Sequence, residues 1–230
     1  MLRSTTRLVP CTRLLIAAGA WSPEVFRALF PSSKLRIPVT PLAGHSLLLR
    51  SPRWSAEHEE KGCHAVFATD ESGFSPEVFS RIGGEIYIAG LNSSKIPLPR
   101  VATDAKISDE SVGRLKEVAK RMLGLPDGED DLEILREGLC FRPVTSSGRP
   151  IVSRVPDQKL GDGLKPRGDG EGGVFVAAGH GAWGMSSWTL RFVQILTVFP
   201  GISQSLGTGK VMAEMLEGQP TSANVQALSL

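Results

Sequence analysis

The sequence predicts an α/β fold, and three observations carry the prediction. Two continuous apolar runs, Leu14 to Ala18 and Val174 to Ala178, each end at a glycine, which is typical of strands covered on both faces. The segment from Ser108 to Gly124 carries apolar residues at the i, i+3, i+7 spacing, which indicates an amphipathic helix. Shorter apolar stretches bounded by Gly and Pro lie between these segments and indicate further strands.

The composition excludes several classes of protein. The chain has 230 residues, enough for one large domain or two small ones. Its 26 basic and 24 acidic residues leave a net charge of +2, so no strongly basic face argues for nucleic acid. The best apolar stretch, Trp188 to Phe199, contains Arg191 and is too short to span a membrane. Three cysteines without a CxxC pair indicate neither a disulfide framework nor a zinc site and fit a reducing compartment, by default the cytoplasm.

The amino-terminal region allows two interpretations. The first twenty residues contain Arg3, Arg7 and Arg13 and no acid, a composition found in organellar transit peptides. The apolar run that begins at Leu14 favours a buried strand instead. Ser22, Pro23 and Glu24 follow it as an N-cap, N1 and N2 sequence, which predicts a helix from Pro23 to about Leu29.

The middle of the chain predicts an antiparallel or mixed sheet with one helix, from Ser108 to Gly124. We expect the residues between the second and third of its strands, 70–84, to form a loop. The first expected strand begins near Gly44 and is preceded by an extended segment from Ile37. The other expected strands are His64–Thr69, Glu85–Leu91 and Leu132–Val144.

The carboxy-terminal part predicts a surface loop, a strand and a helix. Asp157 to Gly173 is rich in Gly, Asp and Lys, as surface loops are. After the strand from Val174, Gly209 to Glu217 is expected to be helical, and the small polar tail beyond Pro220 is expected to be frayed.

Some familiar motifs are absent or out of context. Gly168 to Gly173 matches G-x-G-x-x-G but precedes a strand, whereas the dinucleotide fingerprint follows a strand and opens a helix. An NAD-dependent dehydrogenase is therefore disfavoured. No two of the four histidines have the i, i+4 spacing of helical metal ligands, and there is no G-x-S-x-G nucleophile elbow.

Two segments carry chemistry. Gly179-His180-Gly181-Ala182-Trp183-Gly184-Met185-Ser186 directly follows a buried strand, and its glycines allow the backbone to lie against a flat ligand. Arg142 stands near a strand end, before Pro143, where a guanidinium can hold a carboxylate with two parallel hydrogen bonds. An ordinary surface arginine and a structural histidine at position 180 are the alternative interpretations.

At these residues the sequence resembles the FAD-dependent oxidoreductases of the D-amino acid oxidase/glycine oxidase superfamily, and it is most similar to the fungal branch. The similarity rests on four segments in the family's order and spacing. They are Ala17-Ala18-Gly19-Ala20-Trp21-Ser22, Ile37-Pro38-Val39, Arg142-Pro143, and Gly179-His180-Gly181 through Gly209.

The resemblance implies an FAD-binding Rossmann-like domain, here residues 1–36 and 150–230, interleaved with a mixed-sheet substrate domain, residues 37–149. It implies FAD as cofactor, an amine or amino acid as substrate, and hydride transfer to the flavin. Arg142 matches the family's carboxylate-binding arginine. The implied cofactor-binding residues are Ala18, Gly19, Trp21, Gly179, His180, Gly181, Gly184 and Met185.

The sequence departs from the family pattern twice. The family's amino-terminal strand, glycine-rich turn and helix, which hold the ADP half of FAD, do not precede the Ala-Ala-Gly-Ala-Trp segment. We therefore expect an incomplete FAD-binding domain that binds FAD weakly or not at all. Ser187 to Gln204 interrupts the family spacing, and we expect it to be a retained intron. A non-catalytic remnant or interaction protein is the alternative function, and the substrate, electron acceptor and oligomeric state stay open.

Overall fold

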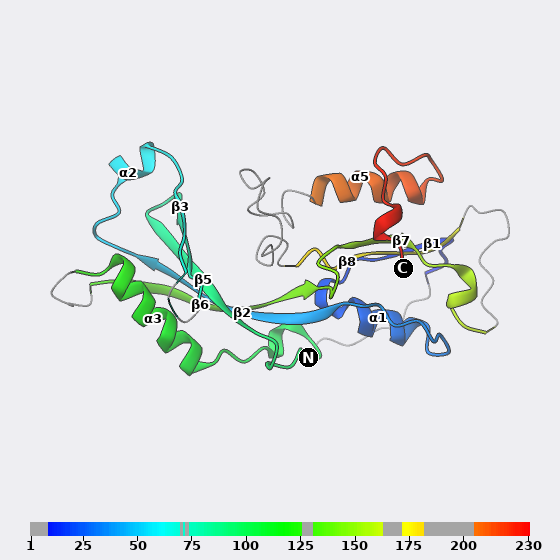
Figure 1. Cartoon of the computed structure of the whole chain (residues 1–230), viewed down its shortest axis with the longest axis horizontal. Coiled ribbons are helices and arrows are strands. Elements are labelled where there is room, and N and C mark those ends of the chain that lie inside the picture. Colours follow the sequence, from blue (N-terminus) through cyan, green and yellow to red (C-terminus); the bar gives the residue numbers. More distant parts are fainter. Residues whose placement is uncertain (1–8, 70, 72–73, 126–130, 163–171, 182–204) are drawn as a thin grey trace. The chain divides into compact units, whose positions relative to one another are not determined.

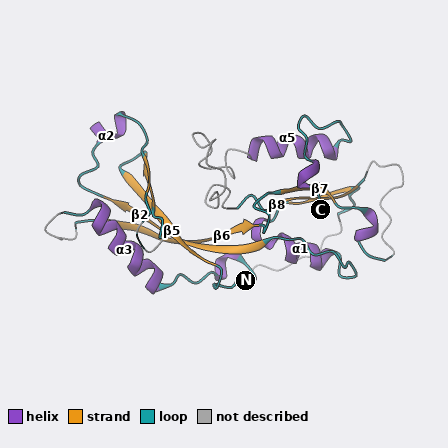
Figure 2. Cartoon of the chain, in the orientation of Figure 1, coloured by secondary structure: helices purple, strands orange, loops and turns teal. Residues whose placement is uncertain are grey.

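The computed structural model describes residues 9–69, 71, 74–125, 131–162, 172–181 and 205–230. The chain forms two compact units, one of Met1–Pro41 with Arg142–Leu230 and the other of Leu42–Phe141. Figures 1 and 2 show the helices and strands of each unit. The assignment of residues 1–36 with 150–230 to FAD binding and of 37–149 to substrate binding stays a prediction.

The first unit contains a mixed three-stranded sheet in the order β1-β8-β7. Strand β1 (Arg13–Ile16) runs parallel to β8 (Gly173–Ala178), with Leu15 opposite Phe175 and Ile16 opposite Val176. Strand β7 (Ile151–Arg154) lies antiparallel on the other side of β8. The two apolar runs of the sequence are therefore neighbours in one sheet, as parallel strands joined through long connections can be.

Strand β8 is buried on both faces, as its continuous apolar run predicts. Val174 and Val176 pack in a cluster with Phe26 of α1 (Ser22–Leu29). Phe175 packs in a second cluster with Val211 and Met212 of α5 (Ser205–Leu216). Because successive side chains of a strand point to opposite faces, α1 and α5 cover opposite faces of the sheet (Figure 2).

The carboxy-terminal tail is docked on the first unit, so the prediction of a frayed end is wrong. A 3-10 helix, η4, spans Gln226–Leu228, and Leu228 packs against the cluster of Phe175. The Leu230 backbone N–H donates a hydrogen bond of 3.2 Å to the Ser153 hydroxyl. The few apolar residues of the tail therefore fix it on the first unit by packing, although the composition of the tail is polar.

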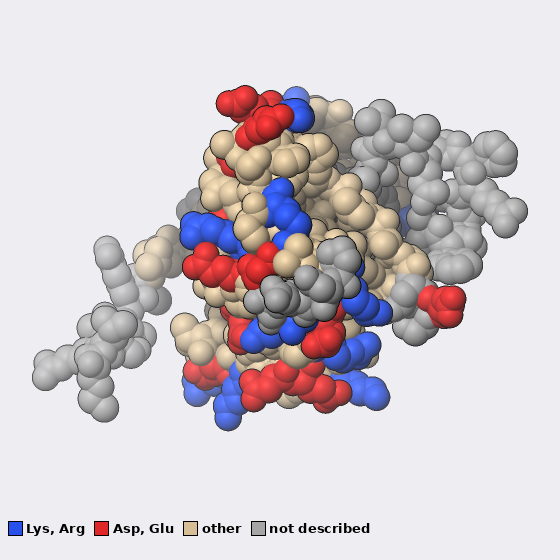
Figure 3. All heavy atoms as spheres, turned by 90° about the vertical axis from the view of Figure 1, so that its left-hand side faces the viewer, with Lys and Arg blue, Asp and Glu red and all other residues tan. Residues whose placement is uncertain are grey.

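The second unit contains a five-stranded sheet in the order β3-β4-β5-β2-β6. Neighbouring strands pair antiparallel at β3/β4, β4/β5 and β2/β5. Basic and acidic side chains are interspersed over the face of this unit in Figure 3. The strands of this sheet are β2 (Thr40–Arg50), β3 (Ala65–Phe67), β4 (Glu77–Arg81), β5 (Glu85–Ser93) and β6 (Glu133–Val144).

One face of this sheet is covered by α3 (Asp109–Leu123), the helix that the sequence predicts most clearly. Leu115 is fully buried against Leu47 and Ile88. The Ser108 hydroxyl caps the helix by accepting a hydrogen bond of 3.3 Å from the Ser111 backbone N–H, and the helix ends at Gly124 as expected. Burial of each such Leu or Ile contributes about 1.5–3 kcal/mol.

The structure corrects several local predictions. The expected loop at residues 70–84 contains β4, and the sequence analysis missed the short helix α2 (Ala56–Glu60) and strand β7. The 3-10 helices η2 (Ala102–Asp104) and η3 (Asp157–Lys159) were also unforeseen. These elements are short, so they carry little periodicity to detect. None of the described helices has the length and apolar character needed to cross a membrane.

Candidate functional site

The carboxyl ends of β1 and β8 lie side by side at one edge of the three-stranded sheet. Because the two strands are parallel and Ile16 is opposite Val176, the chain leaves both strands at the same edge. Ala18 and Gly19 follow β1, and Gly179 follows β8. In open α/β sheets, ligands bind outside the carboxyl ends of parallel strands. The structure thus brings together two predicted site segments that are far apart in the sequence.

The end of β6 contacts the Gly-His-Gly segment within the same unit. A Cβ atom on Gly179 would lie 2.6 Å from Thr145 Cγ2, and one on Gly181 would lie 2.6 Å from Val144 Cγ1 and also clash with the Pro143 carbonyl oxygen. Gly179 also has a φ of 79°, which favours glycine. The protein's own packing therefore requires glycine at both positions. From the sequence, these two glycines were expected to allow the close approach of a flat ligand, whereas in the structure they allow the close approach of β6 and Thr145.

His180 ties this segment to the start of α5. Its Nε2 atom is 3.0 Å from the Thr208 hydroxyl oxygen, a hydrogen bond between partly buried groups. Burial lowers the pKa of His180 below its ordinary value of 6.5. The imidazole is therefore neutral at pH 7 and holds the first turn of α5 beside the end of β8.

Arg142 lies two residues before the end of β6 and is half-buried. The next residues of its strand, Pro143 and Val144, are those that contact Gly181. The predicted substrate arginine and the predicted flavin-facing segment are thus adjacent in the first unit. A single site that uses both Arg142 and this segment stays a prediction.

The turn between β1 and α1 carries a glycine with open space beside it. Gly19 adopts a φ of 55°, and a Cβ atom placed on it would meet nothing within 4 Å. Trp21 is half-buried at the N-cap of α1, where no side-chain hydrogen bond caps the helix. The Ser22 hydroxyl is buried without a hydrogen-bond partner among the described residues. The backbone N–H groups of Trp21 and Ser22 already donate to the carbonyl oxygens of Ala18 and Gly19, so the open glycine and the unpaired hydroxyl are the features of this turn that a polar group of a ligand could use.

Ser22 is the residue that sequence reasoning misjudged. Its type and its position before Pro23 predicted an N-cap, but the helix begins at Ser22 itself. Its hydroxyl consequently makes no capping bond, and the residue is fully buried. Thr208 was missed because its only signal is the bond to His180, which lies 28 residues away.

Several predicted features lie outside the described residues. They are Gly184 and Met185 of the predicted flavin site, the expected intron from Ser187 to Gln204, and the first residues of the G-x-G-x-x-G match at 168–173. Among the described residues there is no group of three or more His, Cys, Asp or Glu side chains able to hold a metal ion.

Comparison with known sequences gives a family match over most of the chain. The model of a family described as FAD dependent oxidoreductase matches residues 3–190. A protein of Schizosaccharomyces pombe named only as an oxidoreductase is 26% identical over 230 residues, covering 97% of this chain and 47% of that protein. A D-amino acid dehydrogenase of Paramagnetospirillum magneticum is 24% identical over 94% of this chain and 39% of its own length. The chain thus spans less than half the length of these relatives.

Solved structures share the fold. Glycine oxidase from Geobacillus kaustophilus superposes with a TM-score of 0.63 at 23% identity, over 95% of this chain and 45% of that protein. Iminodiacetate oxidase from Chelativorans sp. BNC1 superposes with a TM-score of 0.60 at 19% identity, over 97% and 47%. The predicted α/β fold is confirmed by these two likenesses.

Proposed function

Because the chain belongs to the FAD dependent oxidoreductase family, we propose that it carries part of the flavin site and the substrate arginine of an enzyme that oxidises an amine or amino acid. FAD is the cofactor of this family. The chain covers less than half of its relatives, so the proposed activity is that of the whole protein.

One observation supports the proposal above the others. The carboxyl ends of β1 and β8 meet at one sheet edge, and the end of the strand that carries Arg142 packs against Gly181. This edge is where α/β sheets bind nucleotide cofactors. The arrangement joins a cofactor-binding edge to a cation suited to a carboxylate.

Each residue has a proposed role. Arg142 binds and orients the substrate carboxylate, while Gly19 and Ser22 lie along the polar part of the cofactor. His180 acts as a positioning residue, since it holds α5 beside the Gly-His-Gly segment through Thr208. The remaining proposed contacts with the flavin come from Ala18, Trp21, Gly179, Gly181, Gly184 and Met185. When bound, FAD accepts the hydride from the carbon that bears the amine.

An amine or amino acid is the substrate class that the family resemblance at Arg142 implies. It is also the class named in the D-amino acid dehydrogenase and the glycine oxidase. A guanidinium that forms two parallel hydrogen bonds to a carboxylate matches an amino acid better than a simple amine.

Titration of the purified chain with FAD, followed by flavin fluorescence, tests cofactor binding. We expect weak but saturable binding, which Ser22→Ala weakens by about 10-fold through loss of one hydrogen bond to a charged group. Ser22→Ala should leave the stability of the FAD-free chain unchanged or raised, because the hydroxyl has no partner there. Ser111→Ala in the second unit is the control. Absence of saturable binding would support the non-catalytic alternative.

The substrate role of Arg142 is tested in the full-length flavoprotein. Reduction of the flavin is followed without oxygen on addition of small amino acids, in wild type and in Arg142→Gln. We expect kcat/KM to fall by about 100-fold, which is two hydrogen bonds to a charged group. Arg149→Gln, at an exposed position in the turn after β6, is the matched control. Equal rates for Arg142→Gln and wild type would contradict the role.

A further inference from the structure

Thr145 links the end of β6 to the Gly-His-Gly segment through both branches of its side chain. It directly follows Val144, the last residue of β6, and is half-buried. Its hydroxyl donates a hydrogen bond of 2.7 Å to the Arg149 carbonyl oxygen, across the turn between β6 and β7. Its methyl carbon Cγ2 lies 2.6 Å from the position that a Cβ atom on Gly179 would take. The two branches therefore contact different parts of the first unit.

The hydroxyl bond fixes the direction of the methyl group. The Ser147 hydroxyl lies 3.3 Å from the same Thr145 oxygen, and the Gly148 backbone N–H donates to the Thr145 carbonyl oxygen at 3.1 Å. The turn is thus closed on both the side chain and the backbone of Thr145. A β-branched side chain is stiff at χ1, and its two branches are attached to the same carbon. A hydroxyl held at Arg149 therefore keeps the methyl group pointing at Gly179.

The contact at Gly179 is specific to this methyl group. The next nearest atoms to the same Cβ position are Val39 Cγ2 at 3.5 Å and the Ile151 backbone nitrogen at 3.7 Å, which are ordinary van der Waals distances. Gly179 follows Ala178, the residue of β8 that is opposite Ile151 of β7. The Thr145 methyl group therefore sets how closely the chain leaving β8 approaches the end of β6.

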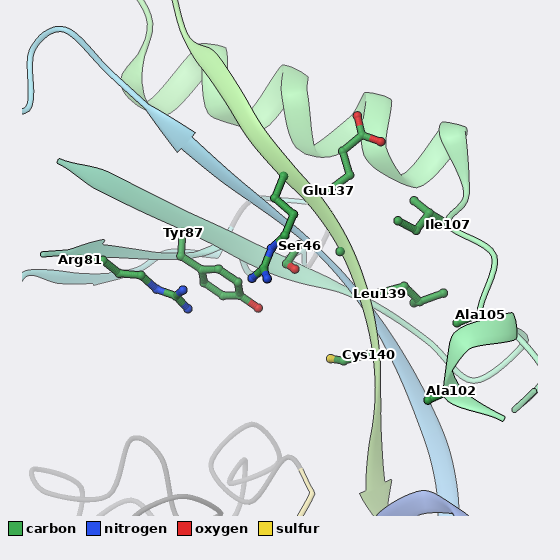
Figure 4. A pocket seen from close by; sticks show the side chains of 11 residues that line it. Ser46, Arg81, Tyr87, Ala102, Ala105, Ile107, Glu137, Leu139 and Cys140 are labelled. Carbon is green, nitrogen blue, oxygen red and sulfur yellow. The ribbon is translucent and has the colours of Figure 1, made fainter. Parts of the chain in front are cut away.

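Strand β6 is the fixed side of this contact. It is hydrogen-bonded to β2 in the five-stranded sheet. Part of it also lines a hollow of about 500 Å³ in that sheet, shown in Figure 4 together with Ser46, Arg81 and Tyr87. Arg142, the proposed substrate arginine, lies three residues before Thr145. A side chain that spaces Gly179 from the end of β6 also spaces it from the strand that carries Arg142.

We propose that Thr145 is a positioning residue, which spaces the Gly-His-Gly segment from Arg142 and so sets the distance between the flavin and the substrate carboxylate. The inference rests on the proposed function, in which the segment contacts the flavin and Arg142 holds the carboxylate. Thr145 acts through Gly179. Its methyl group is the spacer, and its hydrogen bond to Arg149 holds the spacer in place. A misplacement of about 1 Å between reacting groups can lower a rate by about 100-fold.

A double-mutant cycle in thermal unfolding of the chain tests the contact itself. Gly179→Ala should lower the melting temperature by about 4–8 °C, since the added Cβ atom overlaps the Thr145 methyl group at a φ of 79°. Thr145→Ser removes that methyl group and keeps the hydroxyl, so the double variant should recover about half of the decrease. The rest of the decrease is backbone strain at position 179. Thr221→Ser, at an exposed threonine, is the control and should recover nothing.

Flavin reduction without oxygen in the full-length flavoprotein tests the positioning role. Thr145→Ser should lower the limiting rate constant of reduction by about 10-fold and leave the substrate affinity within about 2-fold, because Arg142 is unchanged. Thr145→Val has the same shape as threonine and keeps a methyl group toward Gly179, so its rate constant should stay within about 3-fold of wild type. Thr221→Ser should change neither quantity. A merely structural role would lower the melting temperature without separating the rate constant from the affinity.

The outcomes separate this inference from the proposed function. A double variant that melts no higher than Gly179→Ala, or a Thr145→Ser enzyme that reduces its flavin at the wild-type rate, overturns the positioning role and leaves the proposed function intact. A loss of substrate affinity at an unchanged limiting rate also overturns it, because the methyl group would then serve binding. If small amino acids do not reduce the flavin of the wild-type protein, the proposed function fails and the positioning role fails with it.

Discussion

Substitution of Gly181 by alanine tests the packing between the Gly-His-Gly segment and the end of β6. The added Cβ atom would lie 2.6 Å from Val144 Cγ1 and would also clash with the Pro143 carbonyl oxygen, and real Cβ atoms essentially never come within 3.0 Å of a neighbour. The Val144 side chain can rotate away from this contact. The carbonyl oxygen cannot, because it belongs to the backbone of β6.

The expected cost follows from this difference. Overpacking a well-filled site costs about 1–3 kcal/mol, and the fixed carbonyl places Gly181→Ala near the middle of that range or above, at about 2 kcal/mol. In a protein of this size, each kcal/mol lowers the melting temperature by about 2–4 °C. We therefore expect a decrease of about 4–8 °C.

Thermal unfolding followed by circular dichroism measures the effect. Gly209→Ala is the matched control, because a Cβ atom at Gly209 in α5 would meet nothing within 4 Å. Alanine is a better helix former than glycine by about 1 kcal/mol, so the control should keep or raise the melting temperature. If Gly181→Ala melts at the wild-type temperature, the close contact with β6 does not exist and the proposed adjacency of Arg142 and Gly181 is lost with it.

Three further outcomes are expected. Thr208→Val should cost about 0.5–1.5 kcal/mol in urea unfolding, because it removes the 3.0 Å hydrogen bond to His180, and no loss would mean that α5 is held by apolar contacts alone. Burial lowers the pKa of His45 and His180 below 6.5, so the unfolded chain takes up protons first as the pH falls. Stability is then complete above about pH 6.5 and decreases below it, until the pH has passed the folded-state pKa values. Urea unfolding at about pH 7.5 and 5.5 should show a smaller decrease in His45→Gln, and an unchanged decrease would exclude His45 as a cause. Leu115→Ala should cost about 2–5 kcal/mol because the side chain is fully buried, whereas Leu206→Ala, at a residue 85% exposed, should cost less than about 0.5 kcal/mol; similar losses in thermal melts would refute the assigned core.

Sequence reasoning succeeded where the signal is local. The helix at Asp109–Leu123 is marked by its apolar spacing, its Ser108 cap and its final glycine, all of which act within one or two turns. Strand β8 is marked by an unbroken apolar run. Strand β4 was not predicted, because it has only five residues and about half of them are polar. Pairing with β3 and β5 is what makes this segment a strand.

The candidate site was predictable as a set of residues but not as an arrangement. Arg142, Gly19 and Gly179 stand out through the family resemblance, and the structure places their segments in one unit. The contact of Gly181 with β6 depends on neighbours that are distant in the sequence. The Ser22 hydroxyl is unpaired because α1 begins one residue earlier than predicted.

The amino-acid order alone therefore determined the elements with a strong local signal, such as α3 and β8, because hydrophobic period and end signals act over a few residues. Only the tertiary structure decided that the two Ala-Ala-Gly strand ends lie next to each other, through the parallel pairing of β1 with β8. It also decided that Ser46, Arg81, Tyr87 and Arg136 surround one hollow. Pairing between strands far apart in the chain is set by the packing of the whole core, and no short stretch of sequence encodes it.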